Sequence, residues 1–144
     1  MKRTLPLLSL LVLACPVAAQ TNAPTHTPLR PASECLRPDR INEWLVINAR
    51  TALVRTGPEH YVVKLQSDCP RLGIGPTGLL FRANQSHRSA GQGEICGEVG
   101  ETVRSRDQPP CAIASVEKID KARFQQMSEQ AIHHGTGADQ PPRP

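Results

Sequence analysis

Four cysteines constrain the fold of this chain more than any other feature. They lie 34, 27 and 15 residues apart along the sequence. No two of them form the Cys-x-x-Cys pair that usually brings two thiolates to one zinc ion. A catalytic cysteine would need a partnering base and would have to stay unpaired among oxidants. We therefore predict two disulfides, in preference to a metal site or a nucleophile, among Cys35, Cys69, Cys96 and Cys111.

The N-terminus indicates the compartment in which such disulfides form. Lys2 and Arg3 precede an apolar stretch over residues 5–14, and small residues follow at 17–19. This order is typical of a secretory signal peptide, and the apolar stretch is far shorter than the ~20 residues of a spanning helix. We predict a signal peptide over residues 1–19 and a periplasmic or secreted protein with no transmembrane segment.

A fifth cysteine, Cys15, leaves an alternative open. Residues 12–15, Val-Leu-Ala-Cys, loosely match the motif at which bacterial lipoproteins are cleaved and lipidated. Leu13 and Pro16 fit that motif poorly, so cleavage after Ala19 is favoured over a lipid anchor. In both cases Cys15 is not available to pair with the other four cysteines.

Charge and composition argue against nucleic acid as a partner. The chain has 17 basic and 13 acidic residues, a net charge of +4 that falls to +2 when Lys2 and Arg3 are removed. The two signs are interspersed, so no basic patch for a phosphate backbone is evident. The chain also has too few aromatic residues for a base-stacking surface; they are Trp44, Tyr61, Phe81 and Phe124.

Composition divides the remainder into one domain with two flexible flanks. Residues 20–32 are rich in proline and lack an apolar period, which predicts a disordered tether, and residues 135–144 predict a disordered tail. Residues 33–119 form the predicted disulfide-stapled β-domain, and residues 120–134 a short amphipathic helix. A core of this size is marginal, so two cross-links are a plausible supplement.

Short apolar runs, β-branched residues and one stretch of apolar alternation predict a mainly β fold. Three short strands joined by tight turns indicate an antiparallel meander, and a bulge is expected at Gly97 and Gly100 in a later strand. A helical turn is expected over residues 38–43, and a polar loop over 84–93. The fold class is a small antiparallel sheet or partial barrel of about six strands, over residues 44–47, 51–56, 60–66, 79–83, 94–104 and 111–116.

The same segments resemble a known family. The stretches CLRPDRINEWLVINARTALVRTG, YVVKLQSDCPRLG, EICGEVGETV and CAIASVEKI are similar, in order and cysteine placement, to a family of small bacterial envelope proteins, domain of unknown function 6491. The resemblance covers residues 35–119 and implies an exported fold without an established catalytic residue. The aspartate usual after Ile-Cys in the family has Glu98 as its nearest counterpart, and the tail beyond Asp120 looks like an addition.

Strand order predicts how the four cysteines pair. In an up-and-down meander, successive strand ends lie at opposite ends of the sheet, ~20 Å apart for six residues at ~3.3 Å each. Continuing this alternation places Cys35 with Cys96 at one end, and Cys69 with Cys111 at the other. We predict the disulfides Cys35–Cys96 and Cys69–Cys111.

No constellation in the sequence indicates catalysis. His60 and His87 fall at expected turns, where polar side chains are normally solvated, and His133–His134 lack the i, i+4 spacing that grips one ion. Glu94 and Glu98 would share one face of a strand as solvated carboxylates, and no nucleophile motif is present. We therefore expect no catalytic residue, no metal ligand and no cofactor.

These expectations favour a binding or structural protein of the cell envelope whose partner is an envelope macromolecule. An inhibitor of an envelope hydrolase and an enzyme of unrecognised type remain the alternatives. An inhibitor would present a rigid exposed loop, and the candidate interaction residues are Gly57, Pro58, Glu59 and Arg88. Trp44 begins the most apolar strand and is expected in the core rather than at a binding surface.

Overall fold

The computed structural model describes residues 31–75, 78–106 and 108–137. The predicted signal peptide, the lipidation alternative at Cys15 and nearly all of the predicted tether lie outside the described residues. Most of the predicted C-terminal tail also lies outside them.

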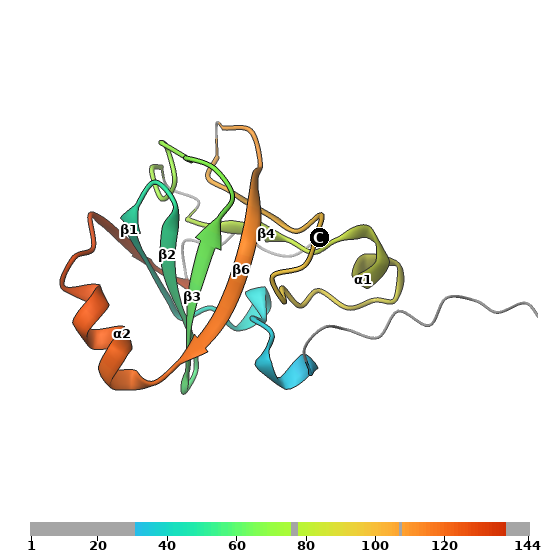
Figure 1. Ribbon diagram of the computed structural model, residues 1–144, viewed down its shortest axis with the longest axis horizontal. Coiled ribbons are helices and arrows are strands. Elements are labelled where there is room, and N and C mark those ends of the chain that lie inside the picture. The colour runs from blue at the N-terminus through green and yellow to red at the C-terminus, as the bar shows by residue number, and fades with distance from the viewer. Residues whose placement is uncertain (1–30, 76–77, 107, 138–144) are drawn as a thin grey trace, which may run out of the picture.

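An antiparallel meander of three strands forms the centre of the sheet (Figure 1). It consists of β1 (Glu43–Asn48), β2 (Thr51–Thr56) and β3 (Glu59–Leu65). All three are rich in β-branched and aliphatic residues, which favour extended backbone. The β2–β3 turn contains Gly57 at φ 61°, a conformation that glycine adopts without steric cost. The prediction of a meander is confirmed.

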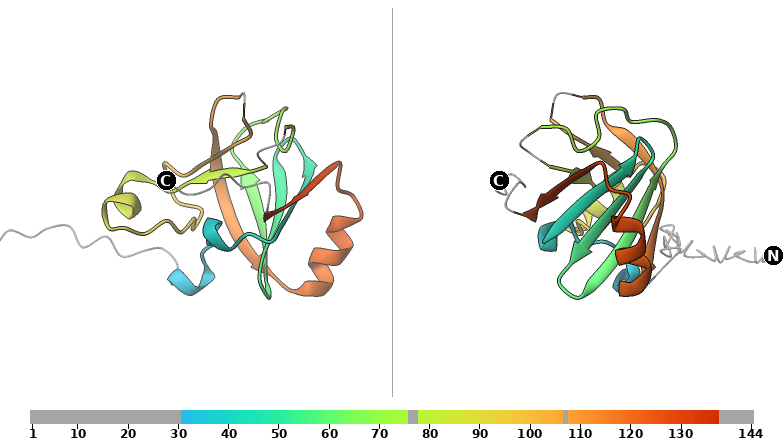
Figure 2. Two further views of the ribbon diagram at one scale, coloured as in Figure 1. Left: turned by 180° about the vertical axis from the view of Figure 1, so that it is seen from behind. Right: turned by 90° about the vertical axis from the view of Figure 1, so that its left-hand side faces the viewer.

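Four further strands extend this meander on both sides. The sheet order is β4-β5-β6-β3-β2-β1-β7, and every pairing is antiparallel. Figure 2 shows the strands curling around one side to give a half-barrel. The mainly β, partial-barrel fold class is therefore confirmed, with seven strands instead of about six. The added strands are β4 (Leu80–Arg82), β5 (Thr102–Arg104), β6 (Cys111–Ile119) and β7 (His133–Thr136).

Side chains on the two faces of the sheet belong to two apolar clusters. Trp44, 3% exposed, and Val46 point into the larger cluster on the concave side, as expected for Trp44. Leu45 and Leu53, which face each other across β1 and β2, belong to the smaller cluster with Phe124. Phe124 lies on α2 (Lys121–Ser128), which contacts β1 and β3. Period-two alternation thus places one row of side chains from each of β1, β2 and β3 in each cluster.

The prediction of a helix over residues 120–134 is wrong in its second half. Asp120 caps α2 by accepting a hydrogen bond from the Arg123 backbone N–H at 2.8 Å, and the helix ends at Ser128. His133–Thr136 then forms β7 and pairs with β1, so residues 133–136 are neither helix nor tail. Backbone pairing to β1 outweighed the loose helical spacing of apolar residues, and Ile132 is 62% exposed.

The prediction of one long strand over residues 94–104 is also wrong. Only β5 is a strand there, and Ile95 makes an isolated antiparallel bridge to Leu36. The segment between them is a turn, and its backbone N–H groups donate hydrogen bonds to the side chain of Glu101. The expected bulge is therefore this turn, which interrupts the strand completely.

Two smaller predictions need correction. The loop expected over residues 84–93 contains α1 (Gln85–Ser89), which is capped by Asn84. The helical turn expected over residues 38–43 is a 3-10 turn, Pro38–Arg40, because Glu43 already belongs to β1. A second 3-10 turn, Ala32–Glu34, precedes Cys35.

Two disulfides close the domain. They join Cys35 to Cys96 and Cys69 to Cys111, which agrees with the pairing expected from the alternation of strand ends. The first ties the segment before β1 to the turn after Ile95. The second ties the segment after β3 to the start of β6. Each closes a long loop and so restricts the unfolded chain strongly.

Candidate functional site

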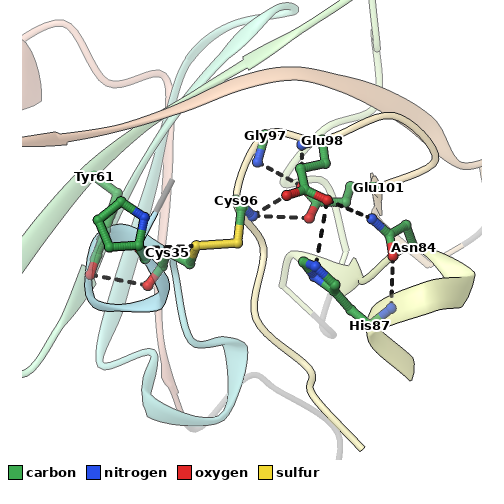
Figure 3. The surroundings of a disulfide bond; sticks show 9 residues. Cys35, Tyr61, Asn84, His87, Cys96, Gly97, Glu98 and Glu101 are labelled. Atoms are coloured by element: carbon green, nitrogen blue, oxygen red, sulfur yellow. Dashed lines mark hydrogen bonds and ion pairs between the residues drawn. A yellow bond between two sulfur atoms is a disulfide. The ribbon is translucent and has the colours of Figure 1, made fainter. Parts of the chain in front are cut away.

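Five polar or sulfur-bearing residues converge beside the Cys35–Cys96 disulfide (Figure 3). Two come from the segment around α1 and three from the turn over residues 96–101. All five are buried, so we call them the buried polar cluster; they are Asn84, His87, Cys96, Glu98 and Glu101.

Glu101 organises the turn from inside. Its side chain is fully buried, and its carboxylate accepts hydrogen bonds from the backbone N–H groups of Cys96 at 2.9 Å, Gly97 at 2.7 Å and Glu98 at 3.0 Å. Successive backbone N–H groups that converge in this way form a concave anion site, which here receives a side chain of the same chain. The negative charge of Glu101 is thus balanced by oriented peptide dipoles.

Gly97 allows the turn to pack closely against the sheet. Its φ is +83°, and a Cβ at this position would lie 2.6 Å from the Val116 backbone nitrogen on β6. Both the conformation and the contact exclude a side chain. The Gly-x-x-Gly pattern of residues 97–100 therefore indicates a tight turn against β6.

A second carboxylate connects this turn to α1. Glu98 Oε2 accepts a hydrogen bond from Asn84 Nδ2 at 3.0 Å and lies 3.5 Å from His87 Nε2. Asn84 Oδ1 in turn accepts from the His87 backbone N–H at 2.9 Å, which is an N-cap. The expectation that His87 and Glu98 are solvated is wrong, because α1 folds over the turn and buries both.

Tyr61 connects the central meander to the disulfide. Its hydroxyl donates to the Cys35 carbonyl oxygen at 3.3 Å. The backbones of Leu36 and Ile95 exchange two further hydrogen bonds of 2.8 Å next to the disulfide. Burial of the ring raises the pKa of Tyr61 above its ordinary value of 10.0, against the opposing effect of the Lys118 ammonium.

Above the buried polar cluster the turn carries one very exposed apolar side chain. Val99 is 90% exposed, whereas its neighbours Glu98 and Glu101 are buried. Gly100 packs against Asn84, since a Cβ there would lie 3.4 Å from the Asn84 Cβ. The tip of the turn is exposed while its base is fixed on both sides.

A surface pocket lies elsewhere on the domain. A pocket of about 680 Å³ is lined by Ser33, Glu34, Glu117 and Lys118, from the first 3-10 turn and the end of β6. Lys118 is ion-paired with Glu59, and this hydrogen bond raises the pKa of Lys118. The buried polar cluster does not line this pocket.

The candidate interaction residues predicted from the sequence lie in two places. Gly57 and Pro58 form the β2–β3 turn, where the Gly57 N–H donates to Asn42 Oδ1, and Glu59 is the first residue of β3. Glu59 is ion-paired with Lys118. Arg88 lies on α1 with an exposed side chain. Arg88 directly follows His87 of the buried polar cluster.

His60 also differs from its expectation. It lies in β3, and its ring centroid is 4.7 Å from that of Phe124 on α2. The sequence did not single out Asn84 or Glu101. An asparagine at a helix start and a glutamate just after Gly-x-x-Gly are the two signals that would have pointed to them.

Chemically, the buried polar cluster fixes backbone rather than meeting a substrate. Each carboxylate is hydrogen-bonded within the fold, and the members are at most 8% exposed. Buried hydrogen-bond networks rigidify a structure. The cluster makes the turn over residues 96–101 a defined surface feature.

Comparison with known proteins gives one match. Residues 1–135 match a family model described as a family of unknown function, DUF6491. The match extends past Asp120, so the expectation that the chain beyond this residue is an addition to the family is wrong up to residue 135. No curated protein and no solved structure matches the chain. Within the part of the chain that the structure describes, no helix has the length and apolarity to span a bilayer.

Proposed function

Since the chain belongs to the DUF6491 family, whose function is unknown, we propose a role from its own geometry: an exported binding module that holds an envelope protein at the turn over residues 97–100. The two disulfides indicate an oxidising location outside the cytoplasm. The signal peptide predicted over residues 1–19 would deliver the chain to the periplasm or exterior. Lipidation at Cys15 would instead hold the same domain at the membrane.

The observation that carries this proposal is the contrast between the tip and the base of the turn. Single exposed apolar residues are common on protein surfaces. Val99 differs because its turn is fixed by the Glu101 hydrogen bonds and by the disulfide at Cys96. A preorganised loop loses little conformational entropy on binding, so even a small apolar contact contributes to affinity.

Exposed arginines on β4, α1 and β5, the elements that flank the turn in sequence, favour a partner with an acidic rim. Arg82, Arg88 and Arg104 are exposed, and none has an ion pair among the described residues. Arg82 pairs across the strands with Thr102, which directly follows Glu101. The two acidic residues of the turn itself, Glu98 and Glu101, are buried. A partner protein with an apolar socket and surrounding carboxylates fits this surface, and its association rate should fall as salt rises.

Photo-crosslinking in a bacterium that carries the protein natively tests the proposal. A photo-reactive amino acid replaces Arg88, and adducts are compared between the otherwise natural chain, Val99→Asp and Ile132→Asp. We expect a discrete adduct that is lost with Val99→Asp and kept with Ile132→Asp. Ile132 is the matched control because it is also an exposed aliphatic residue but lies between α2 and β7.

Two results would overturn the proposal. One is an adduct pattern that is equal in both variants while both proteins stay folded and disulfide-bonded. The other is turnover of an envelope substrate by the purified protein, abolished by one polar substitution without loss of fold, which identifies an enzyme. If the captured partner is a hydrolase whose activity falls when the protein binds, the module is an inhibitor.

A further inference from the structure

We propose that Cys96, when it is not bonded to Cys35, forms with His87 and Glu101 a binding site for a borderline divalent cation such as Zn²⁺. This site lies beneath the turn and does not depend on the binding role proposed above. It would exist only in the reduced state of the Cys35–Cys96 pair.

The ligand atoms are already close together. A ring nitrogen of His87, the sulfur of Cys96 and a carboxylate oxygen of Glu101 all lie within 4.8 Å of one another. Ligands of tetrahedral zinc at about 2.0–2.3 Å from the ion stand roughly 3.3–3.8 Å apart. Side-chain adjustments of about 1 Å would therefore complete the site. Sulfur, imidazole and carboxylate are all ligands that Zn²⁺ accepts.

Glu101 is oriented for such a role by the backbone. Its Oε2 accepts from three N–H groups, those of Cys96, Gly97 and Glu98, whereas its Oε1 accepts only from that of Cys96. Oε1 thus keeps a lone pair for a cation while the N–H groups hold the carboxylate in place, as outer-sphere hydrogen bonds do in metal sites.

Glu98 places a second carboxylate beside the imidazole, outside the group of three close ligand atoms. Its Oε2 lies 3.5 Å from His87 Nε2, so a cation bound to the imidazole would lie close to this second carboxylate. One thiolate and two carboxylates would more than balance the charge of a divalent ion. Burial of all four side chains excludes competing water.

The oxidation state of Cys96 controls the site, because its sulfur atom can bond either to Cys35 or to the cation. In the disulfide, Cys96 has no thiolate to offer a cation. An external dithiol breaks the S–S bond by giving two electrons and two protons to Cys35 and Cys96 and becomes a disulfide itself. Zn²⁺ then displaces the thiol proton of Cys96. Zinc binding and the disulfide therefore exclude each other.

The variant Cys35→Ser tests the site without a reductant. It leaves Cys96 as a free thiol and keeps Cys69–Cys111 intact. We expect the exported, purified variant to bind one equivalent of Co²⁺ with a thiolate-to-cobalt charge-transfer band, which Zn²⁺ abolishes. The oxidised natural protein should show no such band. Adding His87→Ala or Glu101→Gln to Cys35→Ser should weaken Co²⁺ binding by about tenfold or more.

Cys96→Ser is the matched control, because it also breaks the disulfide but leaves Cys35 free. An equal charge-transfer band in Cys96→Ser, or no band in a folded Cys35→Ser variant, would overturn the proposal.

If Cys35→Ser does not fold, the site is tested in the natural protein instead. Its Cys35–Cys96 reduction potential, read by thiol alkylation and peptide mapping in dithiol buffers, should rise by about 30 mV for each tenfold excess of free Zn²⁺ over its dissociation constant. A potential that does not change with Zn²⁺ contradicts the site.

Discussion

Two regions of this domain reach an ordered structure by different means. In the meander region, residues 43–65, almost every residue belongs to β1, β2 or β3, and alternate side chains fill the two apolar clusters. In the loop region, residues 78–106, the regular elements are short: β4, α1 and β5. There the disulfide at Cys96 and the buried carboxylates of Glu98 and Glu101 replace the missing ladder hydrogen bonds.

The contrast shows which kinds of substitution each region should tolerate. Apolar burial against a regular ladder tolerates repacking as long as the pattern is kept. A turn held by one carboxylate depends on that single group, because its loss leaves several buried N–H groups without an acceptor. We therefore expect the loop region to respond sharply to a few polar or sulfur substitutions and the meander region to respond to loss of apolar volume.

Removal of the Cys35–Cys96 disulfide should have the largest effect. The bond joins residues 61 apart, so Cys35→Ala with Cys96→Ala should lower the free energy of unfolding by about 4 kcal/mol in the chain-entropy model. Urea unfolding measures this change. Amide exchange should then become faster mostly in the loop region.

The matched control removes Cys69–Cys111, which spans 42 residues. Its loss should cost about the same free energy of unfolding. Equal loss of protection in both regions for the Cys35–Cys96 variant would contradict the comparison.

Truncation of one buried leucine in each region should have the next largest effect and should differ between the regions. Leu53 in β2 and Leu79 before β4 are both fully buried. We expect Leu53→Ala to destabilise the protein by about 3–4 kcal/mol and Leu79→Ala by about 2–3 kcal/mol, because irregular backbone closes around a cavity more readily than a strand does. Chemical denaturation of both variants measures the difference. A larger loss for Leu79→Ala would mean that the loop region is as rigidly packed as the sheet.

Glu101→Gln should have a moderate effect. The amide keeps one oxygen acceptor but loses the charge that three N–H groups now share. We expect a loss of about 2 kcal/mol, in the range for hydrogen bonds to charged groups. Glu94→Gln is the control, since Glu94 is a half-buried glutamate of the same region, and it should change stability by no more than about 0.5 kcal/mol. Equal effects of the two substitutions would remove the argument that Glu101 fixes the turn.

Tyr61→Phe should have the smallest effect, because it removes only one hydroxyl, which bonds the Cys35 carbonyl oxygen and the Thr56 side chain. Loss of the hydrogen bond to the Cys35 carbonyl should cost about 1 kcal/mol at neutral pH. The raised pKa of Tyr61 means that the folded state holds its phenol proton more tightly than the unfolded state. That contribution is complete below pH 10 and is lost as the pH rises through the folded pKa. Above pH 10, the natural protein should therefore lose stability more steeply than Tyr61→Phe. Parallel curves in alkaline urea titrations would contradict this assignment.

The meander was predictable because its information is local. A continuous apolar run in residues 44–47, β-branched residues in 51–56 and alternation in 60–66 predict strands directly. The turn at Gly57 follows from glycine's tolerance of positive φ. The pairing of Cys69 with Cys111 follows from the same regularity, since the end of β3 lies beside the start of its antiparallel neighbour β6. Cys96 does bond to Cys35 as predicted, but it lies in a turn and not in the strand that the prediction assumed. The burial of Trp44 also follows from its position in the most apolar strand.

The errors lie where a distant partner decided the outcome. Residues 133–136 form β7 only because β1 offers a free edge, which the helical spacing of the preceding residues does not reveal. His87 and Glu98 look like solvated polar residues in the sequence, yet α1 and the turn bury them against each other. Glu101 has no motif of its own, because its partners are backbone N–H groups that gather only when the turn forms.

By itself the sequence determined the β class of this protein, its central meander and the framework of two disulfides. These properties depend on residue type and on spacings of a few residues, which act before the chain is compact. The tertiary structure alone decided the seventh strand, the burial of the polar cluster and the exposure of Val99. Those depend on which segments meet across the fold, and the free energy of such contacts exists only once both segments are in place.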